Sequence, residues 1–305
     1  MLHKAMHSES RREDARPAVQ QPWRTLSGTP GWDQLVLPPH NQEALQDLVR
    51  LVQTRSTEPG AHSVMALLTG ERGTGKTTAA RIIAGELGVP LIEIDTFAAA
   101  SRGPAALAAA VWRACQDGVS SRAVLLFDDA ASGLRPGSDP DAVDLPERVA
   151  DYPGLVLFCS RVSVRLSPEQ LPHFNAVIEF PLPEARARER LWRTHLPAGN
   201  RLTDADFALL GRSFRLSAGA IADCTADAVR RASESGSPVD HADVAAAVRA
   251  HFTQWVLARE TEQALHALLS GETGSAPVQA PVEQPVGRAP VAPARGLLRR
   301  ALRRG

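Results

Sequence analysis

Five short runs of mostly apolar residues, each four or five residues long, recur through the first two thirds of the chain. They cover residues 64–68, 91–94, 124–127, 155–158 and 177–180. Between most of them lie segments with the apolar spacing of helices, such as residues 77–87 and 104–116. Buried strands that alternate with helices are typical of a parallel sheet covered on both faces. We therefore predict an α/β domain with a parallel five-stranded sheet over residues 23–183, and we expect Trp112 to be a core residue.

The strand-like runs stop near residue 183, and only helical patterns follow. They cover residues 184–195, 204–212, 218–233 and 240–269, and the last is long enough to contain a break. We predict a C-terminal all-helical domain over residues 184–269, with Trp192 in its core. Residues 1–22 are polar and are predicted to form a disordered tail. Residues 270–305 are predicted to form a Pro/Ala-rich linker that ends in a basic amphipathic tip.

Composition describes an ordinary globular chain. Hydrophobic residues make up 44% and charged residues 22%, with a formal net charge of zero. This net charge argues neither for nor against a nucleic-acid partner, and we do not expect one. The three cysteines are far apart and lack the spacing of metal ligands. The N-terminus has no signal-peptide pattern, and no run approaches the roughly 20 apolar residues of a membrane span. We expect a cytoplasmic protein with no membrane span.

A glycine-rich segment follows the first apolar run and opens the next helical segment. It reads Gly-x-x-x-x-Gly-Lys-Thr, and this order of strand, loop and helix is the context in which the motif binds a nucleoside triphosphate. Glycines let backbone N–H groups curl around phosphates, and the helix N-terminus adds a positive dipole end. We predict binding of ATP with Mg²⁺, with Lys76 at the β and γ phosphates and the Thr77 hydroxyl on Mg²⁺. The predicted contact residues are Gly70, Glu71, Arg72, Gly73, Thr74, Gly75, Lys76, Thr77 and Thr78.

Lysine usage supports this assignment independently. The chain has only two lysines, Lys4 and Lys76, among 34 lysines and arginines. A compact ammonium group fits between phosphate oxygens where a planar guanidinium does not. Lys76, the one lysine outside the predicted tail, therefore lies at the position of the motif where a lysine binds the phosphates.

Two carboxylates follow the third apolar run. Asp128 and Asp129 come at the end of a predicted buried strand, and strand ends line the ligand crevice in such folds. We predict that Asp128 holds Mg²⁺ through water and that Asp129 lies near the attacking water. Asp129 and Lys76 are the predicted catalytic residues.

With these two motifs placed, residues 32–252 resemble the AAA+ ATPases. More narrowly, the chain resembles the AAA+ proteins encoded with phage-tail-like contractile injection systems. The residues that suggest this are Trp32-Asp-Gln-Leu-Val-Leu-Pro38, Val177-Ile-Glu-Phe-Pro-Leu-Pro183, Arg190-Leu-Trp-Arg-Thr-His-Leu-Pro197 and Phe214-Arg-Leu-Ser-Ala-Gly-Ala-Ile221. The resemblance implies a P-loop NTPase domain with a C-terminal helical lid, a hexamer, and protein partners in a phage-tail-like assembly.

The chain departs from the family pattern at its catalytic positions. The residue after the Mg²⁺-binding Asp is usually Glu, and here it is Asp129, whose carboxylate is one methylene shorter. Errors of about 1 Å in positioning can cost a hundredfold in rate. The sensor 1 position, usually Asn, falls on Arg161 by register, with Ser160 as the nearest polar substitute.

Cationic positions of the family are also changed. The arginine-finger positions read Pro172 and His173, and the sensor 2 position reads Ala222. Arg161, Arg165 or Arg215 could substitute, but no pattern shows that they do. An arginine finger is worth about 10³ to 10⁵ in rate. Its loss should leave ground-state phosphate contacts intact while it depletes those made in the transition state.

The function predicted from the sequence is therefore an ATPase of low turnover, with an assembly or regulatory role in a contractile injection system. One alternative is a nucleotide-gated scaffold that does not hydrolyse ATP. A threading unfoldase is disfavoured, because residues 98–104 replace the aromatic pore loop with Ala, Ser, Arg, Gly and Pro. The C-terminal position of the helices argues against a P-loop small-molecule kinase, and the absence of Asn-Lys-x-Asp argues against a GTPase.

Overall fold

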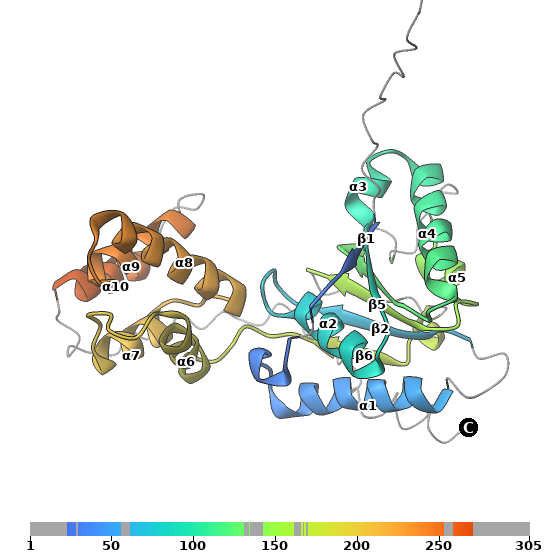
Figure 1. Ribbon diagram of the computed structural model, residues 1–305, viewed down its shortest axis with the longest axis horizontal. Helices are drawn as coiled ribbons and strands as arrows, with labels where there is room; N and C mark the ends of the chain where they lie inside the picture. Colours follow the sequence, from blue (N-terminus) through green and yellow to red (C-terminus); the bar gives the residue numbers. More distant parts are fainter. Residues whose placement is uncertain are drawn as a thin grey trace, which may run out of the picture.

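The computed structural model contains an α/β part and a separate group of helices (Figure 1). It describes residues 23–28, 30–55, 62–130, 134, 143–161, 166, 168, 170–252 and 259–270. The tail predicted for residues 1–22, the linker and tip predicted within residues 271–305, and Arg165 lie outside the described residues.

The sheet has six strands in the order β1-β3-β4-β5-β2-β6. The strands are β1 (Trp23–Leu26), β2 (Val64–Thr69), β3 (Leu91–Asp95), β4 (Val124–Asp128), β5 (Leu155–Ser160) and β6 (Ala176–Glu179). The five apolar runs form β2 to β6, and these strands pair in parallel. The prediction of five strands, all parallel, was wrong by one, because β1 joins the edge of the sheet antiparallel to β3.

Strand β1 is held at the edge by polar contacts. Arg24 Nε donates to Glu93 Oε2 at 2.5 Å, and Trp23 Nε1 donates to Asp117 Oδ2 at 3.1 Å. None of its four residues is buried. A short, exposed edge strand needs no apolar run, and for this reason the pattern that found the other strands does not reveal it.

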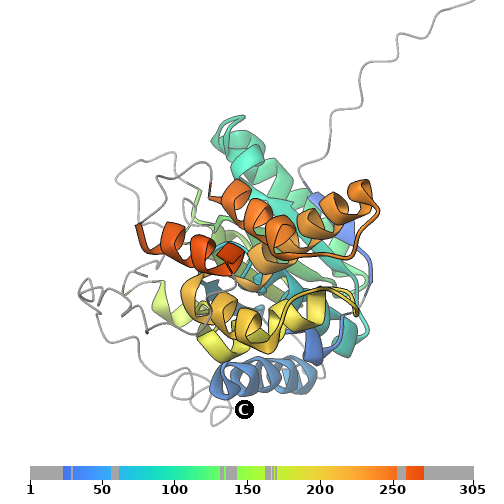
Figure 2. The ribbon, with the colours of Figure 1, turned by 90° about the vertical axis from the view of Figure 1, so that its left-hand side faces the viewer.

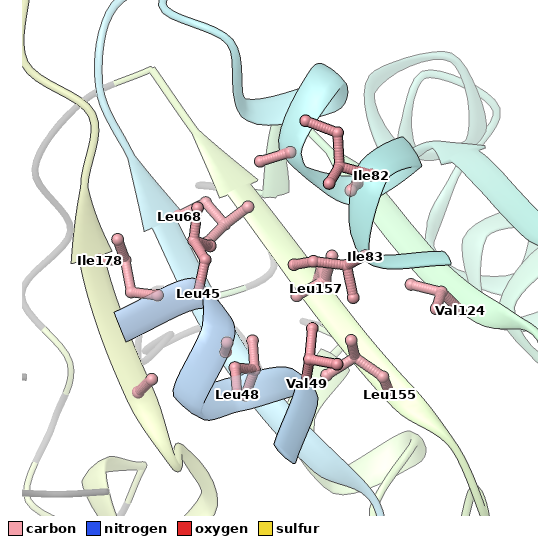
Figure 3. Close-up of a cluster of buried hydrophobic side chains, with 14 of the residues drawn as sticks. Leu45, Leu48, Val49, Leu68, Ile82, Ile83, Val124, Leu155, Leu157 and Ile178 are labelled. Atoms are coloured by element: carbon pink, nitrogen blue, oxygen red, sulfur yellow. The ribbon is translucent and has the colours of Figure 1, made fainter. Parts of the chain in front are cut away.

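Helices cover both faces of the sheet. They are α1 (Pro39–Arg55), α2 (Lys76–Leu87), α3 (Thr96–Ala100), α4 (Pro104–Val119) and α5 (Leu145–Arg148), with 3-10 turns η1 (Trp32–Gln34) and η3 (Leu171–His173). Side chains of α1 and α2 meet those of β2 and β5 on one face, as Figure 3 shows for Leu45, Leu68, Ile83 and Leu157. Alternate strand residues, such as Leu67 and Phe158, point to the other face and pack against α4. The sheet is therefore buried on both sides.

Trp112 is 63% exposed, so its expected place in the core is wrong. Helix α4 buries a different face, and Trp112 lies outside that stripe. The buried positions are Leu107, Ala110, Val111, Ala114 and Gly118. The helical spacing was read correctly, but Leu107, Val111 and three small residues, rather than the tryptophan, form the packed face.

The C-terminal helices pack around a core of their own. They are α6 (Ala185–His195), α7 (Asp204–Ser213), α8 (Ala218–Ser235), α9 (His241–His251) and α10 (Arg259–Ser270). Trp192 is fully buried at this core, as expected. Capping boxes at Thr203 with Asp206 and at Asp240 with Asp243 fix the starts of α7 and α9. Figure 2 looks onto these helices, with the sheet behind them.

The two parts meet at the segment before α1 and at the loop before α2. Leu35 belongs to the core beneath α1 and α2, whereas the next residue, Val36, packs against the core of the helical part. Gly219, in the first turn of α8, donates its N–H to the carbonyl of Gly73 at 2.8 Å. None of the helices in the described part of the chain is long and apolar enough to cross a membrane.

Candidate functional site

The loop between β2 and α2 is formed by backbone that only glycine adopts readily. Gly70 and Gly73 have φ values of 148° and 79°. A Cβ atom at Gly70 would overlap the carbonyl oxygen of Phe180, and one at Gly73 would lie 2.5 Å from Ser217 Oγ. The loop is therefore closed tightly by its neighbours, and its curvature leaves a cradle of the kind that holds phosphate groups.

Lys76 is the first residue of α2 and is 7% exposed. Its Nζ donates to the carbonyl oxygens of Gly70 and Glu71 at 2.6 and 2.8 Å, so the ammonium group lies across the loop. Burial lowers the pKa of Lys76, whereas the neighbouring Asp128 and Asp129 favour its charged form. The loop thus holds a buried cation whose hydrogen bonds are made to backbone carbonyls.

Thr77 and Asp128 lie at the same edge of the sheet. Thr77 is the second residue of α2, and Asp128 is the last residue of β4. The Thr96 hydroxyl donates to the carbonyl of Asp128, which ties the end of β4 to the start of α3. A hydroxyl and a carboxylate are oxygen donors of the kind that Mg²⁺ accepts beside substrate phosphates, so these residues fit the predicted ion.

A protein-only metal cage is absent from the part of the chain that the structure describes. No group of three or more His, Cys, Asp or Glu side chains there could hold a metal ion.

Asp129 is held by an arginine from the adjacent strand end. It has a φ of 54°, a left-handed conformation that is uncommon outside glycine. Arg161 directly follows β5, and its Nη2 donates to Asp129 Oδ2. The other candidate for this position, Ser160, is fully buried. The sequence pattern placed Arg161 at this position by register but did not indicate its ion pair with Asp129. The only sign of the pair in the sequence is that two residues of opposite charge each follow a predicted strand.

The first turn of α8 lies against the glycine-rich loop. Besides the hydrogen bond from Gly219 to Gly73, Ser217 caps the helix by accepting the N–H of Ala220 at 3.2 Å. Ala222 lies in this helix at the predicted sensor 2 position, and Arg215, just before it, is exposed. The helical part thus touches the loop through backbone and a hydroxyl, without a cation from Ala222.

Two further regions were singled out from the sequence. Pro172 and His173 form the exposed turn η3 ahead of β6. The alanines of residues 98–100 end α3, but Phe97, one residue earlier, is 69% exposed. Phe97 is therefore an exposed aromatic residue directly before residues 98–104, the segment in which no aromatic was found. The sequence analysis missed Phe97 because it considered the loop and not the short helix α3.

Comparison with known proteins places the site in a class. The family model described as "ATPase family associated with various cellular activities (AAA)" matches residues 66–144, which contain the loop and both aspartates. The crystal structure of the FIGL-1 AAA domain is similar, with 18% identity and a TM-score of 0.59 over 83% of this chain and 92% of that one. The same domain in complex with ADP matches with 16% identity and a TM-score of 0.59, over 84% and 94%.

Residues 66–144 therefore match the AAA family model, and the structural likeness shows that the chain has the α/β fold of the FIGL-1 AAA domain. No curated protein matches the sequence. At such identities the structural likeness establishes the fold, so the finer function has to be argued from the site itself.

Proposed function

We propose that this protein binds ATP with Mg²⁺ at the loop of residues 70–78 and hydrolyses it slowly. The observation that carries the proposal is Lys76, buried at the start of α2 and held across a glycine cradle. The ADP complex of the similar FIGL-1 domain supports an adenine nucleotide as the ligand. ATP and Mg²⁺ together would supply a polarised terminal phosphate for attack by water.

Each residue of the site has a role in this proposal. Backbone N–H groups of the loop bind the phosphates, and Lys76 neutralises the charge of the β and γ groups. Thr77 and Asp128 hold Mg²⁺, the latter through water. Asp129 orients the attacking water and accepts its proton.

Slow turnover is proposed from the residues that would stabilise the transition state. Asp129 is engaged by Arg161, and Ala222 offers no charge. The finger positions carry Pro172 and His173, neither of which is a permanent cation. A missing finger corresponds to about 4 to 7 kcal/mol of barrier. Binding contacts are retained while rate-enhancing contacts are depleted.

The resemblance motifs extend the proposal to a biological role. We propose an assembly or regulatory ATPase of a contractile injection system, cytoplasmic and hexameric. Co-purification with contractile sheath components would test the role in the injection system, and the mass of the nucleotide-bound protein in solution would test the hexamer. The alternative, a scaffold that binds ATP without hydrolysing it, is favoured by the same depleted contacts.

The chain offers a matched pair of variants for testing the site. Lys76→Ala should weaken both ATP and ADP binding at least tenfold, a loss of about 1.4 kcal/mol or more. Lys4→Ala, which removes the only other lysine, should bind as the wild type does. Affinities are measured by titration calorimetry. Equal affinity of wild type and Lys76→Ala would refute the site.

Phosphate release decides between the ATPase and the scaffold. The wild type should release phosphate more slowly than about 1 s⁻¹, the low end for enzymes, and Lys76→Ala should release none above background. The protein concentration should be varied across any oligomerisation. Release faster than about 1 s⁻¹ would refute attenuation, and no release at all would favour the scaffold.

A further inference from the structure

Helix α4 has two apolar faces, and the sheet covers the one that includes Val111. Beside that face, Ala108, Trp112, Cys115 and Val119 follow one another at the spacing i, i+4, i+7 and i+11. This is the period of a seam that packs on another helix. Trp112 is 63% exposed and Val119 44%. Much of the second face therefore lies open to solvent in the described part of the chain.

The second face of α4 forms one wall of a groove with a volume of about 310 Å³. The other wall is the segment after α5, which contributes Arg148, Asp151 and Tyr152. The Tyr152 hydroxyl donates to the carbonyl of Ala123, and a Cβ atom at Gly118 would lie 2.6 Å from Tyr152 Oη. Tyr152 is thus fixed close against α4, so the groove is formed before any partner binds.

The dimensions of the groove suit a short helix. At about 1.5 Å per residue, the seam from Ala108 to Val119 is about 17 Å long. A stripe of that length and about one helix wide covers roughly 170 Å², whereas each partner in a standard protein interface buries about 800 Å². The groove by itself is too small to hold two folded domains together. It is large enough for an amphipathic helix that lays its apolar face in a groove.

The C-terminal tip, residues 295–305, has the size and polarity of such a helix. As a helix it would be about 16 Å long, with Leu298 and Leu302 on one face and arginines on the other. Its arginines would remain in solvent near Asp151, whose side chain is 97% exposed. Arg148 also lines the groove, so apolar packing, and not charge, is what matches the tip to it.

The position of the tip in the chain favours the groove of a second molecule. Helix α10 ends at Ser270 in the helical part, whereas α4 lies at the opposite end of the molecule (Figure 1). A flexible linker of the length of residues 271–294 has a root-mean-square span of about 27 Å. A compact chain of this size is about 45 Å across. Docking within one molecule would require a strongly stretched linker, and docking between molecules would not.

We propose that the groove beside α4 binds the C-terminal tip of a second copy of this chain, with Leu298 and Leu302 packed against Trp112 and Val119. The contact is independent of the nucleotide site. It joins molecules head to tail, because the groove and the origin of the tip lie at opposite ends. Contacts of this kind either close into a ring or continue as an open chain.

A peptide with the sequence of residues 295–305 tests the groove directly. It is titrated against the full chain carrying Leu298→Ser and Leu302→Ser, whose own tip cannot compete. Adding Trp112→Ser should weaken peptide binding at least tenfold, because an aromatic anchor is lost. Phe97→Ser, which removes an exposed aromatic outside the groove, should leave binding unchanged. Equal binding with and without Trp112→Ser would refute the proposal.

Thiol labelling shows where the peptide binds. Cys115 lines the groove, whereas Cys159 and Cys224 are buried, so the peptide should slow the labelling of Cys115 several-fold. Burial raises the pKa of Cys115 to about 11, so the reaction is followed at alkaline pH, where more thiolate is present. Peptide binding without protection of Cys115 would place the peptide elsewhere and overturn the proposal.

A reordered peptide separates apolar docking from attraction between charges. It contains the same residues in an order that has no apolar face, and it should neither bind nor protect Cys115. Equal binding of both peptides would mean that only charge attracts the tip, and the proposal would fail. It would fail equally if the original peptide bound vesicles of phosphatidylcholine and phosphatidylserine but not the protein.

Mixing two full-length variants distinguishes docking between molecules from docking within one. Trp112→Ser keeps the tip, and the chain with Leu298→Ser and Leu302→Ser keeps the groove. Neither should associate with itself through this contact, but their mixture should form pairs, seen as a larger mass in sedimentation velocity at equal total concentration. A mixture that behaves as the mean of its components would refute the link. Unchanged ADP affinity and unfolding midpoint show that each variant is folded.

Discussion

Asp206 is a buried charge that the helical part satisfies completely. It is 2% exposed, and its Oδ2 accepts from the N–H and hydroxyl of Thr203 at 2.7 Å and contacts His241 Nε2 at 2.9 Å. Burial acts to raise the pKa of Asp206, but the Thr203 hydrogen bonds and His241 outweigh it, so the net pKa is lowered. One carboxylate thus joins the start of α7 to the start of α9.

The lowered pKa of Asp206 predicts a pH-dependent contribution to stability. A depressed carboxylate pKa stabilises the fold above the unfolded-state value of about 3.9, and this contribution disappears as pH falls through the folded-state value. Asp206→Asn should therefore cost about 1 kcal/mol at neutral pH through the weakened cap. Its deficit relative to wild type should shrink as the pH falls below the ordinary aspartate pKa. Urea unfolding across that range measures it, and a deficit independent of pH would contradict the assignment.

At the residue scale, the sequence predicted what depends on local order. Residues 70–78 were predicted to bind phosphate because that chemistry needs glycines, one lysine and a threonine in fixed succession; in the structure residues 70–75 join β2 to α2, and residues 76–78 begin α2. The pair of Asp129 and Arg161 depends instead on β4 and β5 being neighbours. Strand order is a property of the fold, so the partner of Asp129 could not be read from the chain.

Among the elements, α8 has the closest relation to the loop. A Cβ atom at Gly219 would lie 2.9 Å from the Cα of Gly73 and 3.3 Å from its carbonyl oxygen. Both atoms are backbone, so neither can yield without moving the loop or the helix. The glycine at this point lets the helix N-terminus touch the loop directly.

Gly219→Ala should therefore separate α8 from the loop. We expect nucleotide affinity to fall about tenfold or more, because the backbone hydrogen bond from Gly219 to Gly73 is lost and the loop is displaced. Gly236→Ala, at the other end of α8, is the matched control: its added Cβ meets nothing within 4 Å. That variant should lose a little stability from its φ of 68° but keep its affinity. Equal affinity in both variants would show that the contact is dispensable.

Elements were predictable in proportion to the apolar surface they bury. Strands β2, β4 and β5 have continuous buried runs and were located within about two residues. Strand β1 is held by polar side chains, and α3 and α5 are only five and four residues long, too short to show a period. The exposure of Phe97 and Trp112 was not predicted, because an apolar side chain in a helix does not by itself indicate which face of the helix is buried.

On the scale of the whole molecule, ligand binding should stabilise more than the loop. The sheet part and the helical part have separate cores, joined at the loop by Gly219 and before α1 by Leu35 and Val36. A ligand at 100 times its Kd contributes about 2.7 kcal/mol to the state that binds it. Both parts contact the loop or the residues that pack against it, so ligand binding should increase the stability of both parts.

We expect ADP at this concentration to raise the midpoint of thermal unfolding by several degrees, at about 2 to 4 °C per kcal/mol for a chain of this size class. Trp192 is one of five tryptophans and lies in the helical core, so its fluorescence in a variant with the other four replaced by phenylalanine should shift along with the far-ultraviolet signal of the whole chain. In Lys76→Ala the shift should vanish. A shift seen by circular dichroism but not by fluorescence changes of the helical core would mean that the two parts unfold independently.

Adjacent residues Leu35 and Val36 pack against different parts of the molecule and so link any movement of one part to the other. Leu35 lies in the core of the sheet part, where its Cδ1 would sit 2.7 Å from a Cβ atom at Gly75, and Val36 packs on the helical part. The chain itself crosses between the parts at residues 180–184, which connect β6 to α6. If the helical part turned about this connection, it would either displace Val36 or lose its contact with that side chain. Strand β1, which precedes Trp32, is therefore linked along the chain to one of the two segments that such a movement would displace.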